Sequence, residues 1–190
     1  MRLGICVSGQ GTNLRNLVER GFDVVAVATN RSSCGGADFA RERKIPLAEL
    51  SQKSFDSAEQ RDTAMRDFFM RHRVELVIDA GYDRIHTAPF LEAFENRIIN
   101  VHPSLLPEFA GVMNAVEQAL DSGVKQTGAT VHVVTGELDA GPILLQEAVP
   151  ILEGDTVETL SQRVHEAEYR ILPAGIKLME ARLANSPLIR

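Results

Sequence analysis

The N-terminal residues alternate between short apolar runs and a helical pattern, and this constrains the fold more than any other feature of the chain. Residues 3–7 (LGICV) form an apolar run, and residues 8–13 (SGQGTN) contain the glycines of a tight turn. Apolar residues then recur at helical spacing from Leu14 onward, before a second β-branched run at residues 22–29 (FDVVAVAT). This order of elements predicts repeated βα units and therefore a parallel sheet.

The alternation continues through the first half of the chain. It predicts helices over residues 37–43 and 56–72, and strands over residues 45–47, 74–80 and 97–101. In an open α/β sheet, ligands bind at the carboxyl ends of the strands, where the connecting loops gather. Polar motifs that follow these strands are therefore candidates for a functional site.

Beyond Gly111 the pattern changes. Residues 112–122 are predicted to be helical, whereas residues 130–134 and 143–149 have the composition of two paired strands. A polar loop containing glycine separates these two strands. The second half of the sheet is therefore expected to be antiparallel or mixed.

A long final helix is expected after the last strand. Asp155 and Glu158 have the spacing of a capping box at its start, and Pro173 is expected to kink the helix or begin a second one. The predicted fold class is thus α/β, as a single domain over residues 1–190. Its Rossmann-like parallel N-terminal half continues into a mixed sheet with a long C-terminal helix.

Composition and charge exclude several classes of protein. Of 190 residues, 44% are hydrophobic and 24% charged, which is ordinary for one folded domain. The net charge of −6 is spread along the chain and argues against a protein whose main partner is nucleic acid. The N-terminus is apolar for only about seven residues, too few for a signal or membrane segment. Since Cys6 and Cys34 imply no disulfide framework, we expect a cytoplasmic protein.

The glycine turn at residues 8–13 suits an anion. Exposed amides at a helix N-terminus bind phosphate, glycine permits close backbone approach, and Thr12 and Asn13 can donate further hydrogen bonds. The turn matches neither the dinucleotide GxGxxG motif nor a P-loop. Residues of this kind indicate either a phosphate site or a purely structural βα turn with an N-cap.

An amide, an imidazole and a carboxylate form the second candidate group. Asn100 and His102 alternate in an extended segment, so their side chains share one face, and Asp139 lies in a loop next to glycine. Asn can stabilise an oxyanion, His can transfer a proton, and Asp can orient or charge that His. Taken singly, each also fits a structural role.

The remaining histidines show no metal-ligand spacing. His72 is expected at a solvated helix end and His132 in a structural position on a strand, and no cysteine is close in sequence to any histidine. We therefore expect no metal.

Five segments together carry a resemblance to a known family. They are residues 8–13 (SGQGTN), 80–82 (AGY), 100–107 (NVHPSLLP), 128–132 (GATVH) and 137–142 (ELDAGP). They resemble the phosphoribosylglycinamide formyltransferases, the folate-dependent glycinamide ribonucleotide transformylases of purine synthesis. The resemblance extends over nearly the whole chain.

The resemblance implies direct transfer of a formyl group from 10-formyltetrahydrofolate, the co-substrate, to the amine of glycinamide ribonucleotide through a tetrahedral intermediate. Asn100 would hydrogen-bond the developing oxyanion, and His102 would be the general acid that protonates the leaving folate nitrogen. Asp139 would raise the pKa of His102 by direct or water-bridged contact.

The same resemblance implies two sets of binding residues. Gly11, Thr12 and Asn13 would bind the substrate phosphate, and Glu168 the ribose hydroxyls. The folate would contact Asn100 and, largely through their backbone, Asp83, Arg84, Ile85 and His86. Leu91 would form an apolar wall, and the loop 135–139 would close over the folate. This divides the domain into a phosphate-binding half, about residues 1–100, and a folate and catalytic half, about residues 80–190.

Three positions depart from the pattern of the family. Asp83 stands where a large apolar residue such as Met is usual, and His86 where Leu is common. Ala58 stands where many relatives carry a folate-contacting Arg, for which Arg61, one helical turn later, is the candidate replacement. These departures concern the folate pocket and leave the formyl-transfer residues intact.

Other functions remain open at this point. Formyltetrahydrofolate deformylase, methionyl-tRNA formyltransferase and a sugar-nucleotide formyltransferase share the Asn, His and Asp core. The first two normally carry an additional N-terminal regulatory or C-terminal basic domain, which we do not expect here. A non-catalytic folate or nucleotide-binding module is an alternative from another class.

We expect the partners of this protein to be small-molecule substrates. We expect it to bind neither nucleic acid nor a membrane, and to be a monomer or a homodimer.

Overall fold

The computed structural model describes residues 1–185, which form two compact units. The first unit comprises Met1–Asn100 together with Val133–Leu138. The second comprises Val101–His132 and the chain from Asp139 onward. Strand β5 (Ile98–His102) carries the chain from the first unit into the second.

The first unit is built from successive βα units. Its elements are β1 (Leu3–Val7), α1 (Thr12–Glu19), β2 (Val24–Thr29), α2 (Gly35–Glu42), β3 (Leu47–Glu49), the 3-10 turn η1 (Gln52–Ser54), α3 (Ala58–Arg71), β4 (Leu76–Asp79) and α4 (Ala88–Ala93). Parallel pairing joins β1 to β2 and β4, β2 to β3, and β4 to β5. The parallel N-terminal half predicted from the sequence is confirmed, with element ends shifted by a few residues.

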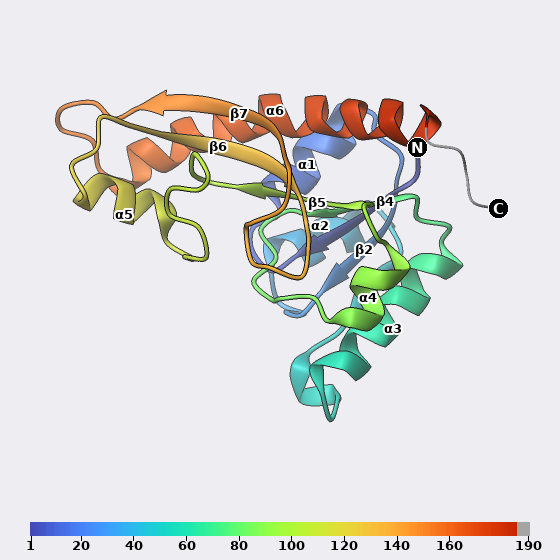
Figure 1. Ribbon diagram of the computed structural model, residues 1–190. Coiled ribbons are helices and arrows are strands. Elements are labelled where there is room, and N and C mark those ends of the chain that lie inside the picture. Colours follow the sequence, from blue (N-terminus) through green and yellow to red (C-terminus); the bar gives the residue numbers. More distant parts are fainter. Residues whose placement is uncertain (186–190) are drawn as a thin grey trace. The chain divides into compact units, whose positions relative to one another are not determined.

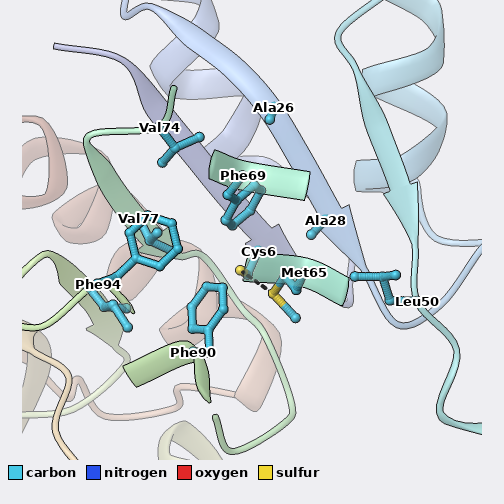
Figure 2. Packing of buried hydrophobic residues seen from close by; sticks show 11 residues of the cluster. Cys6, Ala26, Ala28, Leu50, Met65, Phe69, Val74, Val77, Phe90 and Phe94 are labelled. Atoms are coloured by element: carbon cyan, nitrogen blue, oxygen red, sulfur yellow. Dashed lines mark hydrogen bonds between the residues drawn. The ribbon is translucent and has the colours of Figure 1, made fainter. Parts of the chain in front are cut away.

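A hydrophobic cluster fixes α3 and α4 against this sheet (Figure 2). Cys6 and Ala28 come from the strands, while Met65 and Phe69 from α3 and Phe90 from α4 cover them. The Phe69 ring lies 6.0 Å from the Phe90 ring, centroid to centroid. Because aromatic side chains bury large apolar areas, this cluster is a main source of stability for the first unit.

The second unit contains α5 (Ala115–Asp121), β6 (Gln126–Val133), β7 (Ile143–Pro150) and α6 (Val157–Asn185). Strands β6 and β7 pair antiparallel, with a register shift between Val131 and His132, and α6 packs along β7 (Figure 1). A Cβ atom at Gly175 of α6 would lie 2.8 Å from Cγ1 of Val131, so glycine permits the close approach of the helix to β6.

The strand order is β3-β2-β1-β4-β5-β6-β7. The predicted α/β class is confirmed, as are the mixed but mostly parallel sheet and the long C-terminal helix. Within residues 1–185, no helix is both long and apolar enough to cross a membrane. Cys6 and Cys34 are free and buried.

The start of α6 differs from the predicted capping box by one residue. Thr156 Oγ1 accepts from the Thr159 amide at 3.3 Å, and Thr159 Oγ1 accepts from the Thr156 amide at 3.0 Å. Asp155 instead accepts from the Leu152 amide at 2.7 Å and pairs with Arg163, so its carboxylate is not available as the cap. The predicted cap by Asp155 and Glu158 is therefore wrong in register.

Helix α6 also continues through Pro173, where a second helix was one of the two expectations. The lost backbone hydrogen bond is tolerated because the surrounding turns are held by packing: Leu172, Pro173 and Ile176 are buried. Tertiary contacts thus override the local preference of proline.

We predict that Phe69→Ala lowers the free energy of unfolding by about 3–5 kcal/mol, because it leaves a cavity in place of a fully buried ring. Urea denaturation measures this loss. Met70→Ala is the matched control, since its side chain is 58% exposed on the same helix and its loss should stay below about 1 kcal/mol. Equal losses in the two variants would contradict the placement of α3.

Candidate active site

A buried carboxylate lies between two imidazoles in the second unit. Asp139 Oδ2 is 3.5 Å from His102 Nδ1, and Asp139 Oδ1 is 3.5 Å from His132 Nε2. The Gly111 amide donates to Asp139 Oδ2 at 2.8 Å. The three side chains are between 2% and 8% exposed. The structure thus brings together His102 and Asp139, as predicted, and adds His132.

Burial and charge act in opposite directions on this group. Burial lowers the pKa of His102; the Asp139 charge and the Phe109 carbonyl raise it, and the His132 charge lowers it further, so the net shift is downward. Burial raises the pKa of Asp139, but hydrogen bonds from His132 and Gly111 and the His102 charge outweigh this, so that pKa is lowered. The Asp139 charge raises the pKa of His102, as predicted. The net pKa of His102 is nevertheless lowered, so the predicted rise does not occur.

The second ring nitrogen of His102 also has a partner. His102 Nε2 lies 3.0 Å from the Phe109 carbonyl oxygen, in the loop that follows β5. Asn100 stands two residues earlier on β5, so its side chain and that of His102 project from the same face of the strand. One strand therefore presents an amide donor and an imidazole together.

The residues predicted to bind the ribonucleotide lie on two helices. Gly11 is the N-cap of α1 at φ 72°, without a side-chain cap, and Thr12 and Asn13 begin the helix. A Cβ atom at Gly11 would lie 2.5 Å from the Gly36 Cα, so only glycine fits. Glu168 is buried on α6. The uncapped N-terminus of α1 offers its amides to an anion.

Asp83, the most unexpected residue of the predicted folate segment, is held by polar groups of the first unit. Its Oδ1 accepts from Asn30 Nδ2 at 2.7 Å, its amide donates to Ser8 Oγ at 3.0 Å, and Arg31 pairs with Oδ2. Burial raises the pKa of Asp83, but the hydrogen bonds from Asn30 and Ser8 and the charges of Arg31 and Arg84 outweigh this, so the pKa is lowered and the carboxylate is ionised. The charge is thus neutralised within the unit.

His86 is buried, whereas its neighbour Ile85 is 63% exposed. His86 Nε2 lies 3.0 Å from each carboxylate oxygen of Asp79, and the ring stacks on Tyr82 and Phe90 at centroid distances of 5.3 and 4.4 Å. The imidazole therefore points into the first unit. A contact of His86 with folate can be made only through its backbone.

This segment also has unused backbone donors. Within residues 1–185, the backbone amides of Arg84, Ile85 and His86 donate no hydrogen bond. Leu91, on α4, packs against the hydrophobic cluster of the first unit and is partly buried. Consecutive unpaired amides suit a ligand that carries hydrogen-bond acceptors.

Arg61 does not replace the arginine that Ala58 lacks. It is 2% exposed, and its guanidinium pairs with Asp62 at 2.7 Å. It also donates to Gln52 Oε1 at 3.0 Å and to the Ile85 carbonyl at 3.2 Å. The expectation that Arg61 contacts folate is wrong, because its side chain is buried and its donors are already bound.

Cys6, Asp79 and His86 form a cluster that sequence spacing did not predict, with one potential metal-ligand atom of each within 4.8 Å of the others. Burial and the neighbouring Asp79 raise the pKa of Cys6 well above its usual value, so the thiol keeps its proton. Thiols bind metals as thiolates. The Asp79 carboxylate is already paired with His86 Nε2, and Cys6 Sγ lies 3.6 Å from Met65 Sδ. The expected absence of a metal stays a prediction.

His132 is the functional candidate that the sequence analysis missed. It was interpreted as a structural residue on a strand, and it is indeed buried on β6, but it also contacts Asp139. The available signal was its polar side chain within an apolar strand, inside the segment 128–132 that carried part of the resemblance.

Comparisons with known proteins identify the family of the chain. Residues 1–176 match the model of the formyl transferase family. The chain is 36% identical over 182 residues to phosphoribosylglycinamide formyltransferase of Haemophilus influenzae, covering 93% of this chain and 85% of that protein. The crystal structure of glycinamide ribonucleotide transformylase 1 from Symbiobacterium toebii is similar at a TM-score of 0.90 and 42% identity, covering 96% of this chain and 89% of the other.

Longer relatives match as well. Trifunctional purine biosynthetic protein adenosine-3 of Bos taurus is 40% identical over 184 residues, which cover 94% of this chain. The chain spans only 18% of the length of that protein. The family match over most of the chain and the full-length relatives confirm what the motifs predicted: the chain belongs to the formyl transferase family.

Proposed function

We propose that this chain transfers the formyl group of 10-formyltetrahydrofolate to the amine of glycinamide ribonucleotide in de novo purine (IMP) biosynthesis. The observation that carries the proposal is the buried pair of His102 and Asp139, at the end of the strand that also bears Asn100. The names of the relatives, phosphoribosylglycinamide formyltransferase and glycinamide ribonucleotide transformylase, support the choice of substrate.

The chemistry needs an oxyanion donor and a proton carrier. The substrate amine attacks the formyl carbon, a C–N bond forms, and the carbonyl oxygen becomes an oxyanion, which the Asn100 amide stabilises by donating a hydrogen bond. Collapse of the tetrahedral intermediate breaks the bond to the folate nitrogen, which takes a proton from His102. The attacking amine gives up one proton to solvent and His102 takes one back from solvent, so the transfer consumes no net proton. Asp139 stabilises the imidazolium through its charge.

The two nitrogens of His102 have separate tasks in this mechanism. Nδ1 faces Asp139, while Nε2 faces the Phe109 carbonyl at 3.0 Å. The folate nitrogen therefore takes the place of the Phe109 carbonyl as the partner of Nε2 when the substrates bind. Hydrogen bonds of catalytic groups commonly rearrange in this way between the free and bound states of an enzyme.

Substrate binding uses the other predicted residues. Gly11, Thr12 and Asn13 supply the phosphate site at α1, which belongs to the half formed by about residues 1–100, and the buried Glu168 accepts from the ribose hydroxyls. The unpaired amides of residues 84–86 receive the folate within the half formed by about residues 80–190. We further expect a cytoplasmic monomer or homodimer that binds neither nucleic acid nor metal.

Formyl transfer is tested by mixing the protein with 10-formyltetrahydrofolate, with and without glycinamide ribonucleotide. We expect tetrahydrofolate to form only when the ribonucleotide is present. Release of formate without ribonucleotide would instead identify a hydrolase of the deformylase type. Binding of folate without any turnover would identify a non-catalytic module.

Loss of Asn100 or His102 should lower kcat by about 10²-fold or more, because each variant removes a transition-state interaction. Steady-state kinetics of Asn100→Ala and His102→Ala measure this. His72→Ala is the matched control. His72 lies at the C-terminal end of α3, where its ring contacts the Phe68 carbonyl, and it has no part in the proposed reaction, so kcat should be unchanged. Near-normal turnover of folded His102→Ala would rule out the role of general acid.

The pH dependence should follow the charge of Asp139. A general acid works in its protonated form, so the rate falls as pH rises through the pKa of His102, which burial places below its ordinary value. Asp139→Asn removes a charge that raises this pKa and should move the falling limb to lower pH. A pH–rate profile of kcat measures the shift. An unchanged limb in a folded variant would remove Asp139 from this role.

A further inference from the structure

A buried ionic network lies beneath the segment between Gly81 and Thr87, here called the 81–87 loop. Asp62 is fully buried on α3, and its Oδ2 accepts from the Thr87 amide at 2.6 Å and from Thr87 Oγ1 at 2.9 Å. Its Oδ1 accepts from Arg61 Nε at 2.8 Å. The C-terminal end of the loop is thus tied to a charged pair on the helix.

Two further contacts hold the residues just before Thr87. The guanidinium of Arg61 donates to the Ile85 carbonyl at 3.2 Å. The imidazole of His86 is bound by Asp79 and stacked between Tyr82 and Phe90. Ile85, His86 and Thr87 are therefore each fixed by a different buried group.

The start of the loop is held separately. The Ser8 amide donates to the Gly81 carbonyl at 3.0 Å, and Asp83 is bound by Ser8 and Asn30. The loop is consequently anchored at both ends and through its inner side. Within the described residues 1–185, the amides of residues 84–86 donate no hydrogen bond, so they are available to a ligand.

A buried ionic network is weak evidence for stability. Burying charges costs free energy, and buried ion pairs can often be replaced by apolar residues of similar size without loss of stability. What such a network provides is a defined geometry. A loop that is already ordered costs less conformational entropy when a ligand binds, which raises its affinity for the ligand.

We propose that Arg61, Asp62, Asp79 and His86 are positioning residues that hold the 81–87 loop in its folate-binding conformation and thereby set the affinity for folate. The inference rests on the proposed function in that this loop is taken to bind the co-substrate. The side chains of these four residues act through the backbone of the loop and do not touch folate themselves.

The test compares two neighbouring Arg–Asp pairs on α3. Arg61→Met and Asp62→Asn disturb the buried pair, while Arg66→Met and Asp67→Asn disturb the exposed pair, whose side chains are 32% and 54% exposed. We expect the buried-pair variants to raise the KM for 10-formyltetrahydrofolate and the Kd for tetrahydrofolate by about 10–100-fold, as for lost hydrogen bonds to charged groups. The KM for ribonucleotide and kcat should stay within about threefold of the parent values. The control variants should change neither KM.

A milder variant covers the case in which the charge changes prevent folding. Thr87→Ala removes only the hydroxyl that donates to Asp62 and should raise the folate KM and Kd by about threefold to tenfold. For the second pair, Asp79→Leu combined with His86→Leu should raise the folate KM less than either single change, because each single change leaves a buried group unpaired.

Kinetics and calorimetric binding of tetrahydrofolate together decide the matter. An unchanged folate KM and Kd in folded Arg61→Met and Asp62→Asn, or equal rises in both substrate KM values, would overturn the inference. Absence of ribonucleotide-dependent turnover in the parent protein would refute the proposed function, while the tetrahydrofolate Kd of the variants still tests the positioning. Absence of any tetrahydrofolate binding by the parent protein would overturn the inference as well.

Discussion

The register of the parallel strands β1, β4 and β5 is the constraint on which the polar residues of the first unit depend. Cys6 of β1 pairs with Asp79 of β4, and Asp79 pairs with Asn100 of β5. Because these strands are parallel and in register, their carboxyl ends reach the same edge of the sheet. The glycine turn at residues 8–13 and the 81–87 loop therefore both begin at that edge, and Asn100 lies there as well, although the three are far apart in sequence.

Much of this arrangement could be predicted because its signals are local. The apolar run at Leu3–Val7, the glycine turn after it and the alternation of Asn100 with His102 each depend on a few adjacent residues. Partners from distant segments could not be predicted. That Arg61 turns inward to Asp62 and the Ile85 carbonyl depends on how α3 packs over the 81–87 loop, which no local pattern encodes. The contact of His132 with Asp139 depends likewise on how the chain after β6 turns back toward the strand, which the local pattern does not show.

Burial also decides what identical residue types do. Arg61 and Asp62 stand next to each other on α3, as do Arg66 and Asp67, and both pairs join a guanidinium to a carboxylate at 2.7 Å. The exposed pair is screened by water and contributes little. The buried pair is shielded from water, so its remaining donors and acceptors must be satisfied within the protein, and the loop residues Ile85 and Thr87 do this. The same dipeptide is a surface feature in one place and an anchor in the other.

The two buried His–Asp pairs give the sharpest contrast. Burial lowers the pKa of both imidazoles, but the two Asp79 oxygens, each 3.0 Å from Nε2, outweigh it at His86, whose pKa is raised. At His102 the nearest Asp139 oxygen, Oδ2, is 3.5 Å from Nδ1, while Oδ1 faces His132, whose charge also lowers the His102 pKa; burial therefore prevails and the pKa is lowered. A tightly paired imidazole keeps its proton and suits an anchor. A loosely paired one gives its proton up more readily, which is what the proposed general acid requires.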